Sequence, residues 1–194
     1  MGTSILILQG HPDPKGTHLC HALADAYARG AKEGGHDVRR IDVGTLDFPL
    51  LRSEADYLGE AVPPVIREVQ EAVLACTHLV VIFPLWLGTL PALLKALLEQ
   101  VFRPLFAFEY RERGFPAAKL RGRSARVIVT MGSPVFIYRW FYGAHGVRSL
   151  EQGVLRFSGF SPVRRTLFGR VGSVSPEQGA RWRAAIESLG RKGL

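Results

Sequence analysis

The segment GHPDPKGTHLCHAL (residues 10–23) holds the side chains of this sequence best suited to binding an anion. Its loop carries His11 and its expected helix start carries Thr17 and His18, so imidazole and hydroxyl groups meet at a helix N-terminus. Free backbone N–H groups and the helix dipole make such an end attractive to negative charge. Lys15 precedes the Gly-Thr pair, whereas a Walker loop requires its lysine after the second glycine. The segment therefore predicts a site for a phosphate monoester.

The same segment does not predict a metal site or a reactive thiol. His11, His18 and His21 could supply nitrogen ligands, but no carboxylate or cysteine set completes a defined coordination geometry. A thiolate at Cys20 would be favoured by the helix N-terminus, yet no resolving cysteine is adjacent to it. A packing role for this cysteine is the stronger expectation.

A second candidate is the loop PLWLGTL (residues 84–90), which directly follows the apolar run LVVIF at residues 79–83. In open α/β sheets, ligands bind beyond the carboxyl ends of the strands, where such loops gather. Trp86 would either flank a flat aromatic cofactor or pack against the sheet or an interface, and residue type alone slightly favours packing. Gly88 would allow the backbone to approach a ligand closely.

These loops require a framework of alternating strands and helices. Thr89 and Pro91 predict the polar cap and the first turn of a central helix whose leucines share one face. Residues 44–62 and 103–123 are expected to be long irregular connections. The expected strands are residues 4–9, 38–43, 79–83, 125–131 and 163–168. Helices are expected to begin at about residues 18, 63, 91, 147 and 175.

This alternation predicts a parallel sheet with helices on both faces. The first, third and fourth strands are nearly continuous apolar runs, as expected of strands buried on both faces, whereas the second and fifth contain paired arginines and belong at the edges. The order 2-1-3-4-5 satisfies this pattern with right-handed crossovers. The fold class expected is therefore α/β, with residues 1–194 forming a single three-layer domain.

Size and composition agree with an ordinary globular chain. The 194 residues are 47% hydrophobic, which is sufficient for one substantial core. No apolar run is long enough to cross a bilayer, and the N-terminus lacks a secretory pattern. Cys20 and Cys76 are too few for a disulfide framework or a zinc quartet. We therefore expect a cytoplasmic protein without membrane insertion or bound metal.

The net charge of +8 is unevenly distributed. Residues 1–100 carry 8 Lys and Arg against 12 Asp and Glu, while residues 101–194 carry 17 against 5. A basic half attracts anions, but the arginines are scattered and no nucleic-acid-binding motif accompanies them. A phosphate-bearing small molecule is the preferred partner over nucleic acid, and a solvated basic surface is the alternative explanation.

Four segments carry a family resemblance. They are GHPDPKGTHLCHAL, FPLWLGTLPALLKALLEQVF, TMGSP and YRWFYGAHGVRSLEQGVLRFSGF, and together they cover most of the chain. In order and spacing they resemble the flavodoxin-like NAD(P)H:quinone reductase family, which includes the bacterial modulator of drug activity B proteins. The resemblance implies a flavodoxin-like fold, bound FMN or FAD, hydride uptake from NADPH or NADH, two-electron reduction of a quinone, and a homodimer.

The resemblance also implies positions for the cofactor. Trp86 stands one place earlier than the tryptophan common in the family, and Leu-Cys at residues 19 and 20 replaces the usual Phe-Asn. The flavin phosphate is expected near His11, Thr17, His18, Leu19 and Cys20, and the ring between Pro84, Leu85, Trp86, Leu87 and Gly88 on one side and Thr130, Met131, Gly132 and Ser133 on the other.

A third group of residues, in the aromatic segment after the fourth strand, is expected to serve the substrates. Tyr138 can donate a hydrogen bond and His145 can titrate near neutral pH, so both are candidates for proton management during quinone reduction. Simple packing and local hydrogen bonding are their alternative roles. The pocket walls are expected to include Phe136, Tyr138, Trp140, Phe141 and Tyr142.

The function expected is therefore a flavin-dependent NAD(P)H dehydrogenase acting on quinones. One alternative is a flavin-carrying electron-transfer protein without NAD(P)H turnover of its own, although such carriers tend to be compact and acidic. Another is a regulatory or nucleic-acid-binding module that has kept the fold. Flavin type and nicotinamide donor stay open, with Arg139 and Arg148 mildly favouring NADPH.

Overall fold

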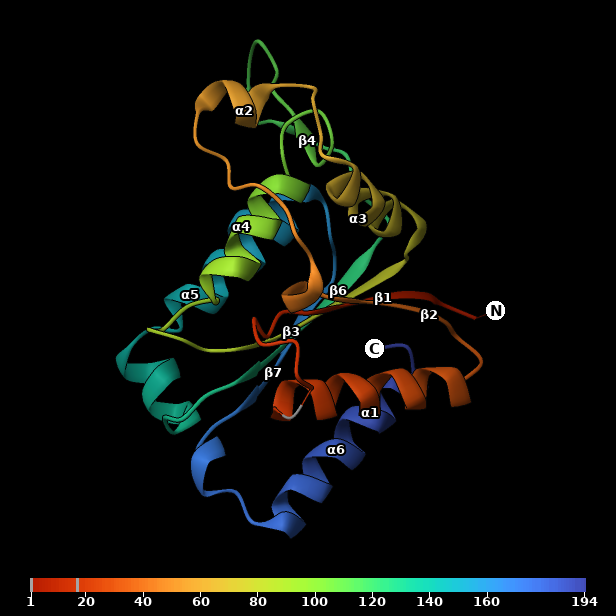
Figure 1. The fold of residues 1–194 in the computed structure, drawn as a ribbon, viewed down its shortest axis with the longest axis vertical. Helices are drawn as coiled ribbons and strands as arrows, with labels where there is room; N and C mark the ends of the chain where they lie inside the picture. Colours follow the sequence, from red (N-terminus) through yellow and green to blue (C-terminus); the bar gives the residue numbers. More distant parts are fainter. Residues whose placement is uncertain (1, 17) are drawn as a thin grey trace.

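Five strands form one parallel sheet in the computed structural model of the chain, which describes residues 2–16 and 18–194 (Figure 1). Their hydrogen-bonded order is β2-β1-β3-β6-β7, which confirms the predicted order 2-1-3-4-5 because β6 and β7 are the fourth and fifth strands of this sheet. The strands are β1 (Ser4–Gln9), β2 (Asp37–Asp42), β3 (His78–Pro84), β6 (Ser124–Thr130) and β7 (Val163–Phe168).

Burial along the strands explains this order. The apolar residues of β1, β3 and β6 are almost completely inaccessible, while β2 and β7 leave arginine side chains in solvent. Strands covered on both faces must be apolar throughout, so only the arginine-bearing strands could occupy the edges.

Helices cover both faces of the sheet (Figure 1). One layer contains α1 (Leu19–Glu33) and α6 (Pro176–Arg191), and the opposite layer contains α3 (Pro64–Ala75), α4 (Ala92–Val101), α5 (His145–Arg148) and the helical segment η3 (Ser149–Arg156). The sheet therefore divides the core into two apolar clusters, one on each side.

Both long connections contain structure that the sequence did not predict. The first includes η1 (Val43–Thr45) and the short helix α2 (Glu54–Leu58), and the second closes into a two-stranded antiparallel hairpin of β4 (Phe108–Glu109) and β5 (Ala117–Ala118). The remaining short helical turns are η2 (Ile137–Phe141) and η4 (Val171–Ser173).

The start of α4 differs from the prediction. Thr89 was expected to cap this helix, but α4 begins at Ala92 with Pro91 at the N-cap position and no side-chain cap. Thr89 instead closes a tight turn with Trp86. The predicted cap of α6 is confirmed, because the Ser175 hydroxyl accepts a hydrogen bond from the backbone N–H of Gln178.

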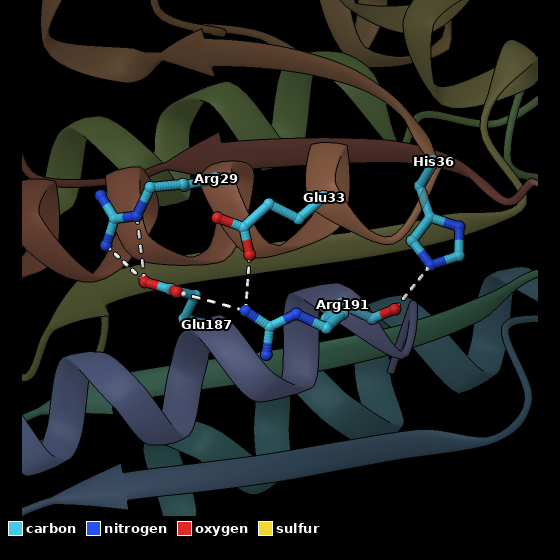
Figure 2. Close-up of polar contacts among 5 residues, drawn as sticks. All are labelled: Arg29, Glu33, His36, Glu187 and Arg191. Carbon is cyan, nitrogen blue, oxygen red and sulfur yellow. Dashed lines mark hydrogen bonds and ion pairs between the residues drawn. The ribbon is translucent and has the colours of Figure 1, made fainter.

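α1 and α6 approach each other closely because glycines lie in their interface. A Cβ atom on Gly30 would lie 2.0 Å from the carbonyl oxygen of Glu187, and one on Gly190 would lie 2.2 Å from that of Tyr27. Figure 2 shows the ion pairs along the edge of this contact, in which Glu187 accepts from Arg29 and Arg191. Exposed pairs of this kind contribute about 0 to 1 kcal/mol, so the backbone contact is the larger constraint.

Within the described residues, none of the helices combines the length and the apolar character needed to span a bilayer.

Candidate functional site

Loops from β1, β3 and β6 meet at the carboxyl edge of the sheet. The backbone N–H of Leu85 donates to the carbonyl of Thr130 at 2.7 Å, which joins the second loop to the end of β6. The Cys20 sulfur lies 3.2 Å from the Thr130 hydroxyl, and the rings of His11 and Trp86 meet edge-on at 5.9 Å. The structure therefore brings together the loops that the sequence assigned to one site.

Three histidines cluster at the start of α1. The rings of His11 and His18 are stacked at 3.8 Å, and the ring of His21 lies 5.5 Å and 5.8 Å from them. Asp13 organises the pair, because its carboxylate lies 2.9 Å from Nε2 of His18 and its backbone N–H donates to Nδ1 of His11. Thr17, also expected here, lies outside the described residues.

In the chain without a ligand, burial disfavours the positively charged forms of two histidines of this cluster. Burial lowers the pKa of His11, and the nearby rings of His18 and His21 lower it further. Burial also lowers the pKa of His21, whose side chain is 3% exposed and whose two ring nitrogens have no hydrogen-bond partner among the described residues. An unpartnered buried polar group costs about 1 to 3 kcal/mol, and an anion would relieve that cost.

The first turn of α1 supplies donors beside the histidines. His18 is the N-cap residue and makes no side-chain cap, so the backbone N–H groups of Leu19 and Cys20 lack intrahelical acceptors. The Cys20 thiol is buried, and burial raises its pKa to about 11. This cysteine is a neutral packing residue hydrogen-bonded to Thr130, so its backbone rather than its sulfur faces an anion. In the sequence, His21 was a candidate only for a metal ligand. Its burial beside His11 and His18 adds it to this site.

The β3 loop forms a tight turn with an unusual backbone. The N–H of Trp86 donates to the carbonyl of Thr89 at 3.0 Å, and the N–H of Thr89 donates back at 2.9 Å. Between them, Leu87 and Gly88 have φ values of 47° and 77°. Two successive positive φ values define a type I′ turn, which costs a leucine about 1 to 2 kcal/mol. Leu87 is fully exposed, and Trp86 is half exposed, so neither side chain belongs to the core.

Two residues from the segment after β6 hold this turn, and we call them the turn clamp. The Tyr138 hydroxyl donates to the Gly88 carbonyl and accepts from the N–H of Val147, each at 3.2 Å. Gly146 packs so closely that a Cβ atom there would lie 2.2 Å from the Gly88 oxygen. Tyr138 is 2% exposed, and burial raises its pKa.

The β6 loop leaves an open backbone surface. Met131 is buried and its N–H donates to the Phe168 carbonyl at 2.8 Å. Gly132 is exposed, and a Cβ atom there would have no neighbour within 4 Å. Ser133 is half buried, and its carbonyl accepts a hydrogen bond from the backbone N–H of Arg170. The edge of a planar ring could therefore approach this backbone without a steric barrier.

Among the residues expected to serve the substrates, only Tyr138 is buried. His145 is exposed, whereas Tyr138 faces inward and contributes to the clamp instead of a wall. Four further aromatic residues that were expected to line a pocket stand in solvent: Phe136, Trp140, Phe141 and Tyr142. Across residues 2–16 and 18–194, no group of three His, Cys, Asp or Glu side chains has a geometry suited to a metal ion.

Comparisons with known proteins agree with this arrangement. A curated Haemophilus influenzae protein named "Uncharacterized NAD(P)H oxidoreductase" is 26% identical over 170 residues, which cover 86% of this chain and 83% of the relative. The solved NAD(P)H:quinone oxidoreductase from Methanothermobacter marburgensis superposes with a TM-score of 0.81 at 21% identity, over 99% of this chain and 97% of the other.

A second solved structure, an FMN-dependent NADH-azoreductase from Bacillus anthracis in complex with FMN, has a TM-score of 0.80 at 16% identity and covers 99% of both chains. The family model described as a flavodoxin-like fold matches residues 3–191. This chain therefore belongs to the flavodoxin-like family known as Flavodoxin_2, as the four sequence segments indicated.

Proposed function

We propose that this chain is a flavin-dependent NAD(P)H oxidoreductase that reduces quinones or related acceptors by two-electron hydride transfer. The observation that carries the proposal is the contact between the histidine cluster at the start of α1 and a strained, exposed turn after β3. A flavin mononucleotide unit has a phosphate at one end and a planar ring at the other. The names of the relatives from Haemophilus influenzae and Bacillus anthracis support the same reaction class.

The residues present suit the phosphate of FMN or FAD. His21 is buried and neither of its ring nitrogens has a partner among the described residues, and Leu19 and Cys20 offer backbone N–H groups at the positive end of a helix. His11 and His18 would contact the phosphate from the loop side, and the contact expected from Thr17 falls outside the described residues. An arriving anion would raise the pKa of His11 and His21 and favour their protonated forms.

The ring would lie between the other two loops. Pro84, Leu85, Trp86, Leu87 and Gly88 would border one edge, and Thr130, Met131, Gly132 and Ser133 the other. When bound, the flavin supplies the redox chemistry, by accepting a hydride from NADPH or NADH and passing two electrons to the acceptor. The chain supplies backbone N–H groups at Leu87, Gly88 and Gly132, which would stabilise negative charge on the reduced ring.

The decisive experiment is purification and reconstitution. The protein should bind FMN or FAD, and chromatography of the extracted cofactor should identify which of the two it carries. The loaded protein should oxidise NADPH or NADH when a menadione-like quinone is added. Flavin binding without nicotinamide-dependent turnover would favour the electron-carrier alternative, and failure to bind either flavin would refute both.

His145 is proposed as a proton donor to the acceptor, because its exposed imidazole packs against Gly143 in the segment that carries the turn clamp. Replacement of His145 with glutamine should lower the rate of quinone reduction without changing flavin content. The measurement is kcat, with Arg181→Gln on the distant helix α6 as the control. An unaltered kcat would leave His145 with a local structural role.

Tyr138, also proposed for proton management, is better placed to position the turn. Its hydroxyl already makes two hydrogen bonds to backbone groups and points away from solvent. A hydroxyl held in this way fixes the position of the Gly88 carbonyl and does not transfer a proton to a substrate.

A homodimer and a cytoplasmic location complete the proposal. Aromatic side chains of the second long connection and of the segment after β6 are exposed to an extent that a partner subunit would reduce, with Phe115 at 92%, Trp140 at 82% and Phe141 at 81%. Both cysteines are free and buried, which suits a reducing compartment. Light scattering of the loaded protein should give twice the chain mass of 21.4 kDa.

A further inference from the structure

Three arginines from three different elements line a cavity of about 460 Å³. Arg139 comes from η2, Arg148 from α5 and Arg165 from β7. The remaining lining residues are small or apolar: Val135, Ala144 and Leu167. A cavity with cationic walls and an apolar base suits an anion attached to an organic group.

Positive charge exceeds negative charge around this cavity. Glu151 is almost completely buried and pairs with Arg165 at 2.6 Å. Burial raises the pKa of Glu151 above its ordinary value, although the nearby Arg165, Arg156 and Arg148 act in the opposite direction. Among the ion pairs of residues 2–16 and 18–194, Arg139 and Arg148 do not appear. Three arginines therefore line the cavity, and the carboxylate of Glu151 contacts only Arg165 among them.

The geometry of guanidinium groups limits what this ligand can be. Arginine presents a planar fork of donors that matches the oxygens of a phosphate, and its charge does not depend on pH in the working range. Several arginines around one cavity favour a dianion over a carboxylate. A phosphate monoester meets this requirement.

The same chain segment forms both the cavity and the flavin site. Val135 lies two residues after Ser133 of the β6 loop. Arg139 directly follows Tyr138, and Ala144 lies two residues before Gly146 of the clamp. The segment that lines the cavity is therefore also the segment that holds the Gly88 turn. A nucleotide whose reactive ring reached the turn would pass close to this segment.

We propose that the arginine cavity binds a phosphate monoester, and that its source is the 2′-phosphate of the nicotinamide donor, so that the enzyme prefers NADPH to NADH. This inference rests on the proposed function for its source, but the binding of phosphate by the cavity does not. The alternative source is free inorganic phosphate or another phosphate monoester.

The test compares Arg139→Gln and Arg148→Gln with Arg164→Gln. Arg164 lies on β7 beside Arg165, is exposed and does not line the cavity, so its replacement removes the same charge elsewhere. Arg165 is left intact because its loss would strand the buried Glu151. Circular dichroism should show that all three variants fold.

Each cavity variant should raise KM for NADPH about tenfold, which corresponds to loss of one charge-assisted hydrogen bond, and leave KM for NADH unchanged. The control should change neither value. Titration of the flavin-loaded protein, whose site at the start of α1 is already occupied, with inorganic phosphate by calorimetry provides a readout independent of turnover, and binding should weaken in the cavity variants and with added salt.

The outcomes separate the two hypotheses. Loss of phosphate binding without any change in the NADPH to NADH preference would keep the anion site and assign it to free phosphate. Equal behaviour of cavity and control variants in both measurements would overturn the inference while leaving the flavin function intact. Absence of flavin turnover with arginine-dependent phosphate binding would refute the function and keep the site.

Discussion

Replacement of Gly146 with alanine is expected to weaken flavin binding by about tenfold or more. The added Cβ would lie 2.2 Å from the carbonyl oxygen of Gly88 and 2.6 Å from the Cα of Thr89. Both are backbone atoms, so no side-chain rotation can relieve the overlap, and the turn itself must move. Displacement of backbone donors by about 1 Å is enough to lose hydrogen bonds to a rigid ring.

The measurement is the dissociation constant for FMN, from quenching of flavin fluorescence. Gly153→Ala is the matched control, because this glycine lies in the adjoining segment η3 and a Cβ there would have no neighbour within 4 Å. Thermal melting of both variants separates a local effect from unfolding. Wild-type affinity in a folded Gly146→Ala protein would show that the turn does not contact the flavin.

Tyr138→Phe tests the other half of the clamp. The change keeps the buried ring but leaves the Gly88 carbonyl and the Val147 N–H without their shared partner, at a cost of about 1 to 3 kcal/mol. The expected result is weaker flavin binding in the same direction as Gly146→Ala, with an unchanged pH profile of turnover. A flattened pH profile would instead indicate that the hydroxyl transfers a proton.

Gly190→Ala should destabilise the fold by about 2 to 3 kcal/mol, the range for overpacking a close contact. Its Cβ would lie 2.2 Å from the carbonyl oxygen of Tyr27 and 2.9 Å from the N–H of Ala31, both on α1. Alanine favours a helix by about 1 kcal/mol over glycine, so the steric cost must exceed that gain. Separation of α1 and α6 would also uncover Ile186, which is fully buried between them.

Urea denaturation of the flavin-free protein measures this effect. Gly179→Ala on the same helix is the control, since the nearest atom to its Cβ would be the flexible end of Arg183 at 3.4 Å. This control should be neutral or stabilised by up to about 1 kcal/mol. Equal stability of the two variants would mean that the helices can move apart without cost.

Local signals were sufficient to predict the sheet. Continuous apolar runs such as LVVIF at residues 79–83 suit only strands covered on both faces, and paired arginines such as Arg164 and Arg165 exclude an inner position. Parallel strands share their carboxyl edge, so the order of strands also predicted that three particular loops would meet. The pattern therefore predicted that the segment at residues 10–23 and the aromatic segment after the fourth strand lie at one edge of the sheet.

The details of the site depend on contacts between residues far apart in the sequence. Thr89 has the residue type of a helix cap, but its backbone pairing with Trp86 makes it the end of a type I′ turn. Leu87 has no intrinsic preference for a positive φ, and the turn is held by Tyr138, 50 residues beyond Gly88. Local propensity carries no information about such a clamp.

Residue types alone therefore determined the strand order and the edge of the sheet at which the three loops meet, because burial acts through composition and spacing. Folding decided that Tyr138 supports a turn, that His21 is a buried unpartnered imidazole and that Arg139, Arg148 and Arg165 share one cavity. Each of these arrangements joins residues that lie on different elements, so it depends on how those elements pack together.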